Sequence, residues 1–405
     1  MKNTLKKILI VCDSFGFPHG RASAGRVKNI AYGLHQNGVD VHILITVPSE
    51  RKRSVLNIHH CGSGQDFSYN YSFNNTILSD SKIKRMFQKC YGLLMSCYFL
   101  INNKETLDFV IFYARKTQTL FLLGLICRSL KIKTAVELCE WPESFIRKSK
   151  FQTYIKKIYS INVFKWVDSA IVISTFLAKK VQEYESQSGR SCPSFLLPIL
   201  VRKSEFVNGM KTSANGNSIV FCGNLDYIEL IEFLFDSIQV LIDSDIDFKL
   251  VIIGSADIPG NLEKLKSKAT EKNLEKYVYF TGYISKRELL NYYREASVLA
   301  IPLPSGIRSE ARFPTKIGEY LISGRPIVTT KVGDIPKYMK NLETCFMVEP
   351  DSPYLYGEAL RMALNDKPFA EKIAERGKQV AVGYFDPIIE CKKLLHFLND
   401  QHIIN

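Results

Sequence analysis

Five charged side chains gather in the segment 308–319, namely Arg308, Glu310, Arg312, Lys316 and Glu319. Three of them are cations that lie between the end of an apolar run and the start of a helix-like segment. This arrangement suits a diphosphate, which charged donors and helix amides bind well. A carboxylate one turn into the helix can accept two neighbouring hydroxyls, as a ribose presents them. The residues alone are equally compatible with a solvated loop whose glutamate only complements the helix dipole.

A glycine-containing loop follows the first apolar run of the chain. Gly20 and Gly25 leave room for close backbone approach, and the helix-like segment after them offers its amide dipole to an anion. Their spacing nearly matches the P-loop pattern, but Arg26 and Val27 stand where that pattern needs a lysine and a hydroxyl residue. We therefore reject a nucleoside triphosphatase, and the dinucleotide pattern G-x-G-x-x-G is also absent. Arg21 and Arg26 could still face a diphosphate across a cleft, although many such loops bind nothing.

Alternating strand-like and helix-like segments must position both loops. The runs 7–13 and 39–47 are rich in β-branched residues, and 23–38 between them has helical apolar spacing that Gly38 closes. This is a β-α-β unit, which implies parallel strands. Further strand-like runs follow at 109–114, 133–138, 169–174 and 194–200.

A polar segment with glycines and asparagines, 201–217, interrupts the series, so we expect a domain boundary there. The predicted domains are 1–205 and 206–385, each a doubly wound α/β domain with its ligands at the carboxyl ends of the strands. The second domain has strand-like runs at 218–224, 248–255, 278–283, 297–304 and 325–330.

A last helix is predicted over 386–405. Asp386 is its expected N-cap, and Pro387 fits the first helical position. Apolar residues at helical spacing form its expected buried stripe, which consists of Ile388, Cys391, Leu394, Leu395 and Leu398.

The composition is that of a globular protein, with 46% hydrophobic and 23% charged residues. The ten cysteines are scattered without a CxxC pair, which indicates reduced core thiols rather than disulfides or a zinc site. No apolar stretch reaches the roughly 18 residues of a membrane span, so we expect a cytoplasmic protein. The net charge of +14 is unevenly divided, since residues 1–200 carry +15 and the remainder −1. No nucleic-acid-binding pattern is present, and we therefore favour an anionic membrane surface as the partner of the basic half.

Two stretches of the basic half mix cations with aromatic residues, at 81–102 and 145–166. Their cations include Lys82, Lys84, Arg85, Lys89, Arg147, Lys148, Lys150, Lys156 and Lys157. Such mixtures suit an interfacial helix on anionic lipid, and a core helix with a solvated face is equally compatible. The membrane interpretation predicts a peripheral protein on the inner face of the cell membrane.

The segment 313–328, "FPTKIGEYLISGRPIV", resembles the donor-binding segment of the family-4 retaining glycosyltransferases, which have the GT-B fold. The likeness extends in order to 20–44, 136–145, 219–227 and 277–302. It implies an α/β protein of two doubly wound Rossmann-like domains that face each other across a cleft, with a C-terminal helix crossing back to the first domain. It also implies a nucleoside-diphosphate-sugar donor, either a UDP- or a GDP-sugar, retention of configuration and no permanently bound cofactor.

The resemblance assigns roles to individual residues. Glu319 matches the second glutamate of the family's E-x7-E motif, which binds the ribose hydroxyls, and Ala311 stands at the place of the first. Glu310, one residue earlier, and Glu140 are the candidate catalytic carboxylates. Many relatives carry an arginine and a lysine after the strand that opens the second domain, but "GNLDYIEL" has no base, which gives the cations near Glu319 more weight. The other donor-binding candidates are Gly20, Arg26, Gly223, Asn224, Gly282, Tyr283, Ile284, Arg308, Arg312, Phe313, Pro314, Lys316 and Ile317.

The segment "VELCEWPE" stands where such enzymes place an acceptor-side loop, which makes Glu137, Glu140 and Trp141 the acceptor-side candidates. The implied reaction moves a sugar to a hydroxyl of a lipid-linked or saccharide acceptor, in surface polysaccharide or glycolipid biosynthesis. Cations and helix amides would stabilise the departing diphosphate, so we expect no metal.

Two alternatives remain open. A GT-B nucleotide-sugar epimerase would need acids and histidines in its cleft, yet His19 is the sole histidine in a glycine loop. A catalytically silent nucleotide-sugar-binding scaffold would fit the altered E-x7-E motif. Release of nucleoside diphosphate from a panel of donors separates these alternatives from an active transferase.

Overall fold

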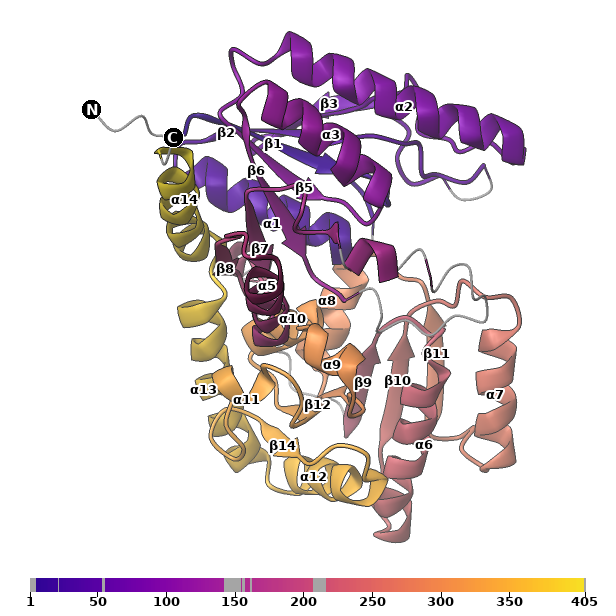
Figure 1. Ribbon diagram of the computed structural model, residues 1–405. Coiled ribbons are helices and arrows are strands. Elements are labelled where there is room, and N and C mark those ends of the chain that lie inside the picture. The colour runs from indigo at the N-terminus through magenta and orange to yellow at the C-terminus, as the bar shows by residue number, and fades with distance from the viewer. Residues whose placement is uncertain are drawn as a thin grey trace. The chain divides into compact units, whose positions relative to one another are not determined.

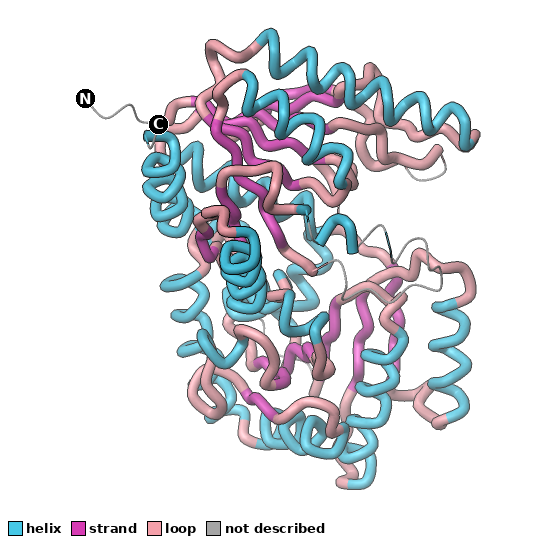
Figure 2. The backbone as a smooth tube through the Cα atoms, viewed as in Figure 1, coloured by secondary structure: helices cyan, strands magenta, loops and turns pink. Residues whose placement is uncertain are grey.

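The computed structural model describes residues 5–20, 22–52, 55–141, 154, 157–160, 162–206 and 216–403. The chain divides into two compact units. The first contains Met1–Leu200 and Pro387–Asn405, and the second contains Val201–Asp386. Each unit has a largely parallel sheet covered by helices (Figures 1 and 2). The prediction of two parallel α/β domains, with a C-terminal helix that returns to the first, is confirmed.

The sheet of the first unit has the strand order β3-β4-β2-β1-β5-β6-β7-β8. Every pairing in it is parallel except that of β3 with β4. Its strands are β1 Lys7–Cys12, β2 Asp40–Ile45, β3 Cys61–Ser63, β4 Ser68–Tyr71, β5 Phe109–Tyr113, β6 Lys133–Leu138, β7 Ser169–Val172 and β8 Ser194–Leu196. Its helices are α1 Ala22–Gln36, α2 Lys82–Asn102, α3 Thr117–Ser129, α5 Thr175–Ser188 and α14 Pro387–Ile403. The central strand β1 is apolar and buried along nearly its whole length, as expected for a parallel strand covered on both faces.

The sheet of the second unit has the order β11-β10-β9-β12-β13-β14, and all of its pairings are parallel. Its strands are β9 Ser218–Cys222, β10 Lys249–Ile253, β11 Val278–Gly282, β12 Val298–Ile301, β13 Ile327–Thr330 and β14 Phe346–Val348. Its helices are α6 Ile228–Asp243, α7 Asn261–Glu271, α8 Lys286–Glu295, α9 Ile307–Ala311, α10 Thr315–Ser323, α11 Ile335–Tyr338, α12 Pro353–Asn365 and α13 Lys367–Tyr384. Helix α6 packs against α12, while α10 packs against α13 and α8.

Three short strands were missed from the sequence, namely β3, β4 and β14. Each has three or four residues, and β3 is an exposed edge strand without an apolar pattern. The buried stripe of the last helix is also shorter than predicted. Cys391, Leu394 and Leu398 are fully buried, but Ile388 is 37% exposed. Ile388 lies in the first turn at the margin of the stripe, and its inclusion was wrong.

The last helix lies directly against α1 (Figure 1). Gly33 makes this approach possible, because a Cβ there would lie 2.2 Å from the carbonyl oxygen of Pro387 and 2.6 Å from Sγ of Cys391. Asn37 Nδ2 donates to the carbonyl of Ile388 at 3.0 Å and ties the two helices together at their ends.

Replacing Gly33 with alanine is expected to destabilise the protein by about 1–3 kcal/mol, because the new methyl overpacks the contact with α14. Gly25 in the same helix is the matched control. Nothing lies within 4 Å of a Cβ at Gly25, so Gly25→Ala should stabilise the helix by about 0.5–1 kcal/mol. Urea unfolding of both variants checks this pair. Equal midpoints would contradict the close α1–α14 contact.

Candidate functional site

The strand order of the second unit reverses between β9 and β12, which are neighbours in the middle of its sheet. The chain runs from β9 through β10 to β11 on one side, and from β12 through β13 to β14 on the other. Open parallel sheets bind ligands outside the carboxyl ends of the strands at such a reversal. The loops that follow β9 and β12 are therefore the parts of this unit to inspect for a ligand site.

Three glycines stand at the carboxyl ends of β9, β10 and β11, namely Gly223, Gly254 and Gly282. Gly254 has a φ of +148°, and a Cβ there would lie 1.9 Å from the carbonyl oxygen of Gly223. The Gly223 amide donates to Ile253 at 3.0 Å, and the Gly254 amide donates to Gly282 at 3.1 Å. Asn224 shapes the next turn, since its Oδ1 accepts from the amide of Asp226 at 2.9 Å.

Lys316 and Glu319 form an ion pair on α10, with 2.7 Å between Nζ and Oε2. Tyr293, a buried residue of α8, donates from its hydroxyl to the same Oε2 at 3.2 Å. The two paired side chains are 27% and 20% exposed, so solvent still reaches them. No hydrogen bond from another described residue reaches Oε1 of Glu319. One carboxylate oxygen is thus held in place while the other can accept a hydroxyl.

Both members of this pair are charged at neutral pH. Burial lowers the pKa of Lys316, but the nearby Glu319 carboxylate outweighs burial and the net pKa is raised. Burial raises the pKa of Glu319, but Lys316 outweighs it and the net pKa lies below its ordinary value of 4.5. Glu319 is therefore a carboxylate that stays ionised well into the acidic range.

Tyr227, in the loop after β9, holds two arginines of the segment after β12. The guanidinium carbon of Arg308 lies 4.0 Å from the centroid of the Tyr227 ring, and that of Arg312 lies 5.8 Å from it. Arg312 Nη1 also donates to the Tyr227 hydroxyl at 3.3 Å. Glu229 lies 3.6 Å from Nη1 of Arg308. The two loops at the β9/β12 reversal are thereby joined by stacked cations.

Other predicted residues of this unit have different surroundings. Phe313 is buried and stacks on Tyr338 with 5.3 Å between ring centroids, and Ile317 is fully buried. Pro314 precedes the first turn of α10, and no side chain caps that turn. Glu310 is exposed and accepts weakly from the Gly333 amide at 3.5 Å.

The loop after β11 presents one of its two predicted residues to solvent. The side chain of Tyr283 is 76% exposed, whereas Ile284 is half-buried. Gly282 ends the strand with a φ of +72°.

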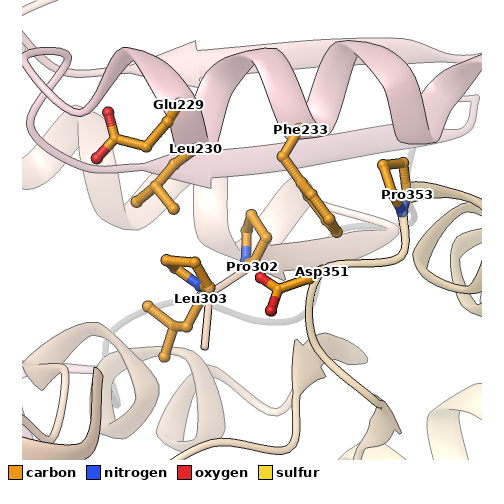
Figure 3. A pocket seen from close by; sticks show the side chains of 8 residues that line it. Glu229, Leu230, Phe233, Pro302, Leu303, Asp351 and Pro353 are labelled. Carbon is orange, nitrogen blue, oxygen red and sulfur yellow. The ribbon is translucent and has the colours of Figure 1, made fainter. Parts of the chain in front are cut away.

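A pocket of 270 Å³ has Glu229, the ion-pair partner of Arg308, in its lining (Figure 3). It lies between α6, the loop after β12 and the loop that leads into α12, and the side chains around it are mostly apolar. Its lining residues are Glu229, Leu230, Phe233, Pro302, Leu303, Pro304, Asp351 and Pro353. Asp351 accepts from the amide of Ser305 at 3.1 Å and so fixes one wall.

In the first unit, the loop after β1 is fixed by residues that the sequence analysis missed. Asn57 is buried and contacts the loop at His19, accepting from its amide at 2.7 Å and donating to its carbonyl at 2.8 Å. Glu50 accepts from Asn57 at 2.6 Å. The Tyr71 hydroxyl contacts both the amide and the carbonyl of Phe17 at 2.9 Å. Gly20 lies in this loop, whereas Arg21 is outside the described residues.

Arg26 and Glu137 form a buried ion pair, with 2.5 Å between Nε and Oε1. The two terminal nitrogens of Arg26 donate to the carbonyls of Pro198 and Leu197. Burial lowers the pKa of Arg26, but Cys139 and Glu137 outweigh burial and the net pKa is raised. This geometry commits both side chains to the packing of β6 against α1.

The other acceptor-side candidates lie just beyond β6. Glu140 is 24% exposed and pairs with Arg115, which follows β5, at 3.2 Å. Trp141 is buried. Asp13 accepts from the amides of Arg115 and Lys116 and so links the ends of β1 and β5.

Some predictions lie outside the described residues. They include most of the stretch 145–166 and with it Arg147, Lys148, Lys150 and Lys156. In the described part of the chain, no group of three His, Cys, Asp or Glu side chains could hold a metal ion. The helices described there are all too short or too polar to cross a membrane.

The second unit is similar in sequence to known glycosyltransferases. The family model "Glycosyl transferases group 1" matches residues 216–366, which contain every donor-binding candidate of the second half. An uncharacterized glycosyltransferase of Methanocaldococcus jannaschii, MJ1607, is 27% identical over 180 residues, covering 44% of this chain and 43% of the relative. The match thus spans less than half the length of this curated relative.

Solved structures extend the likeness to both units. Sucrose-phosphate synthase from Thermosynechococcus elongatus has a TM-score of 0.73 at 14% identity, covering 98% of each chain. HepE from Anabaena, in complex with UDP and glucose, has a TM-score of 0.69 at 14% identity, covering 98% of this chain and 100% of HepE. The fold is GT-B. In GT-B terms the first unit is the amino-terminal Rossmann-like domain, and the second, with the Lys316–Glu319 pair, is the carboxyl-terminal one.

Proposed function

We propose that the chain is a glycosyltransferase that moves a sugar from a nucleoside-diphosphate-sugar to an acceptor hydroxyl. The observation that carries this proposal is the Lys316–Glu319 pair, which lies on the helix after the β9/β12 reversal, inside the region similar to group 1 glycosyl transferases. A UDP-sugar is the favoured donor because HepE, which is similar in fold, binds UDP and glucose. A GDP-sugar is the alternative.

Each group at the reversal has a part in donor binding under this proposal. Oε1 of Glu319 accepts the ribose hydroxyls, while Lys316, Arg308 and Arg312 neutralise the diphosphate. The backbone of Gly223, Asn224, Gly282 and Ile284 lines the site, and the exposed ring of Tyr283 is available to the base. Three cations offset the charge that develops on the leaving diphosphate, so the proposed reaction needs no metal.

The transfer step is the finer part of the proposal. The resemblance to family 4 supports retention of configuration, with Glu310 and Glu140 as the carboxylates that act near the reacting sugar. Arg26 and Glu137 take a structural part here, because both side chains are almost fully buried and are paired with each other within the first unit. The basic first half supports a lipid-linked or saccharide acceptor at the inner face of a membrane, in surface polysaccharide or glycolipid synthesis.

The proposal is tested by release of nucleoside diphosphate from a panel of UDP- and GDP-sugars, with and without a lipid extract as acceptor source. We expect release from at least one donor, and faster release when lipid is added. One alternative deserves the same assay, because buried Ala311 replaces the first glutamate of the family motif. A scaffold would bind the nucleotide without releasing it from any donor, and that result would overturn the transferase.

Tyr227 is expected to matter for donor binding because it orients Arg308 and Arg312. Tyr227→Ala removes the ring under both guanidinium groups and should weaken nucleoside diphosphate binding about threefold to thirtyfold, as the loss of exposed to partly desolvated cation–π contacts implies. Tyr227→Phe keeps the ring and loses only the hydroxyl, so its affinity should stay close to wild type. Titration calorimetry with UDP measures both. Equal losses in the two variants would show that the ring itself does not position the arginines.

A further inference from the structure

Helix α2 presents an apolar face to solvent. Phe87 is 67% exposed, Ile83 66% and Leu94 63%, and further exposed apolar residues follow at helical spacing. The complete set is Ile83, Met86, Phe87, Cys90, Tyr91, Leu94, Tyr98 and Ile101. At 3.6 residues per turn these positions fall within an arc of about 140°. A contiguous face of this kind on the surface of a soluble domain marks a contact with a partner or a membrane.

The opposite face of α2 is already packed. Its buried residues are Gly92, Ser96 and Leu100. A Cβ at Gly92 would lie 2.0 Å from the carbonyl oxygen of Thr46, so the helix lies directly on the end of β2. The Ser96 and Ser72 hydroxyls lie 2.8 Å apart. Because this inner face is narrow and fitted, the helix cannot roll to bury its outer face within the first unit.

Cations border the apolar arc on both sides. Lys84 flanks one margin, and Lys82 and Lys89 lie beyond the other, all of them exposed. Helix α2 has no acidic residue at all. Helix α3 packs beside α2, and Figure 1 shows the two running along one side of the first sheet. An amphipathic helix with lysines at the borders of its apolar face fits the plane of a bilayer, where the lysines meet anionic headgroups.

Charge decides between the possible occupants of this face. A second copy docked through α2 would bring two sets of lysines together without any carboxylate of α2 to offset them. An anionic bilayer supplies both the apolar depth and the negative charge. We propose that the outer face of α2 is a membrane-docking surface that inserts among the lipids of an anionic membrane. This proposal rests on the proposed transferase function. Docking on the membrane would give the enzyme access to a lipid-linked acceptor.

The test is flotation of the full-length protein with vesicles of phosphatidylglycerol and phosphatidylcholine, against vesicles of phosphatidylcholine alone. The wild type should float only with the anionic vesicles. The double variant Phe87→Ser/Leu94→Ser should lose at least tenfold in partitioning. The matched control Ile258→Ser/Leu355→Ser changes two exposed apolar residues of the second unit and should float like the wild type. Equal flotation of both double variants would overturn the proposal.

The charge contribution is tested separately. Each of Lys82→Gln, Lys84→Gln and Lys89→Gln should reduce partitioning about fivefold, and added salt should reduce wild-type partitioning in the same direction. Salt-independent binding would contradict a headgroup contact.

A Leu94→Trp variant should show a blue-shifted emission on addition of anionic vesicles, and an unchanged spectrum would place α2 outside the lipid. Light scattering that finds a wild-type dimer, dissociated by Phe87→Ser/Leu94→Ser, would assign the face to a second copy instead.

The membrane proposal and the transferase proposal can fail independently. Binding of UDP and GDP in the absence of vesicles does not involve α2, so the Phe87→Ser/Leu94→Ser variant should bind nucleotide like the wild type. Flotation without nucleotide binding would leave the docking surface intact and overturn the transferase. Nucleotide binding without flotation would overturn the docking surface and leave the transferase proposal intact.

Discussion

The variant Glu319→Ala is expected to bind nucleoside diphosphates about tenfold to a hundredfold more weakly than the wild type. Its carboxylate is the proposed acceptor for the ribose hydroxyls, and hydrogen bonds to a charged group contribute about 1.5–3 kcal/mol. The substitution also leaves Lys316 without its partner 2.7 Å away. Titration calorimetry with UDP and GDP measures the loss, and steady-state release of nucleotide should fall in parallel.

Glu358→Ala is the matched control for this substitution. Glu358 pairs with Arg361 at the same i,i+3 spacing and the same 2.7 Å, but on α12. Its removal should leave nucleotide affinity unchanged, because the pair lies on the surface away from the β9/β12 reversal and exposed pairs contribute little. Wild-type affinity in Glu319→Ala would remove Glu319 from the donor site.

The variant Lys316→Met is expected to lower nucleotide affinity and to change its pH dependence. Loss of the ammonium removes one proposed phosphate contact, again about tenfold to a hundredfold in affinity. It also removes the nearest cation that lowers the pKa of Glu319, so that pKa should rise in the variant. As the pH is lowered, binding of a UDP-sugar to Lys316→Met should therefore begin to decline at a higher pH than binding to the wild type, and calorimetric titrations over a pH series compare the two.

The free energy of unfolding should also depend on the Lys316–Glu319 ion pair. Because the pKa of Glu319 in the folded protein is depressed, the pair stabilises the fold above the unfolded pKa, and this stability is lost as the pH falls through the folded value. At neutral pH, Lys316→Met should cost about 1–2 kcal/mol, less than a fully buried pair because both side chains are partly exposed. The double variant Lys316→Met/Glu319→Gln removes both charges and should recover stability without recovering affinity. A double variant less stable than either single one would contradict this coupling.

The elements that form the proposed donor site were predictable from the sequence because local patterns specify them. Apolar runs mark β9 and β12, and the segment between β12 and α10 carries its cations within a few residues of one another. Glu319 and Lys316 lie three residues apart on one helix, so their proximity follows from helical geometry alone. The GT-B fold was predictable for a similar reason, since each β-α unit is specified by its own strand and helix patterns.

Long-range pairings were not predictable in this way. Tyr227 meets Arg308 and Arg312 across about eighty positions of sequence, and no local pattern reports that contact. The one hint in the sequence was that the loop after β9 has no basic residue. This left room for the arginines of the segment after β12 to contact that loop. Asn57, which fixes the loop after β1, likewise contacts His19, which lies 38 positions away.

The surroundings of Arg26 were also not predictable from the sequence. Arg26 follows a glycine loop and was expected to face a diphosphate, but its guanidinium is enclosed by Glu137 and two backbone carbonyls. An arginine on the buried face of a helix contacts the side chains of the sheet beneath it, and here Arg26 pairs with the Glu137 carboxylate of β6. Sequence spacing places Arg26 on that face but does not reveal the partner.

We propose that a nucleoside diphosphate binds at the carboxyl ends of β9 and β12. Hydrogen–deuterium exchange of the full-length protein, with and without saturating UDP or GDP, tests it most directly. We expect slower exchange in the amides of 223–227, 282–286 and 306–320, with the rest of the second unit little changed. If nucleotide binds but slows exchange only in the first unit, the nucleotide does not bind at the ends of β9 and β12.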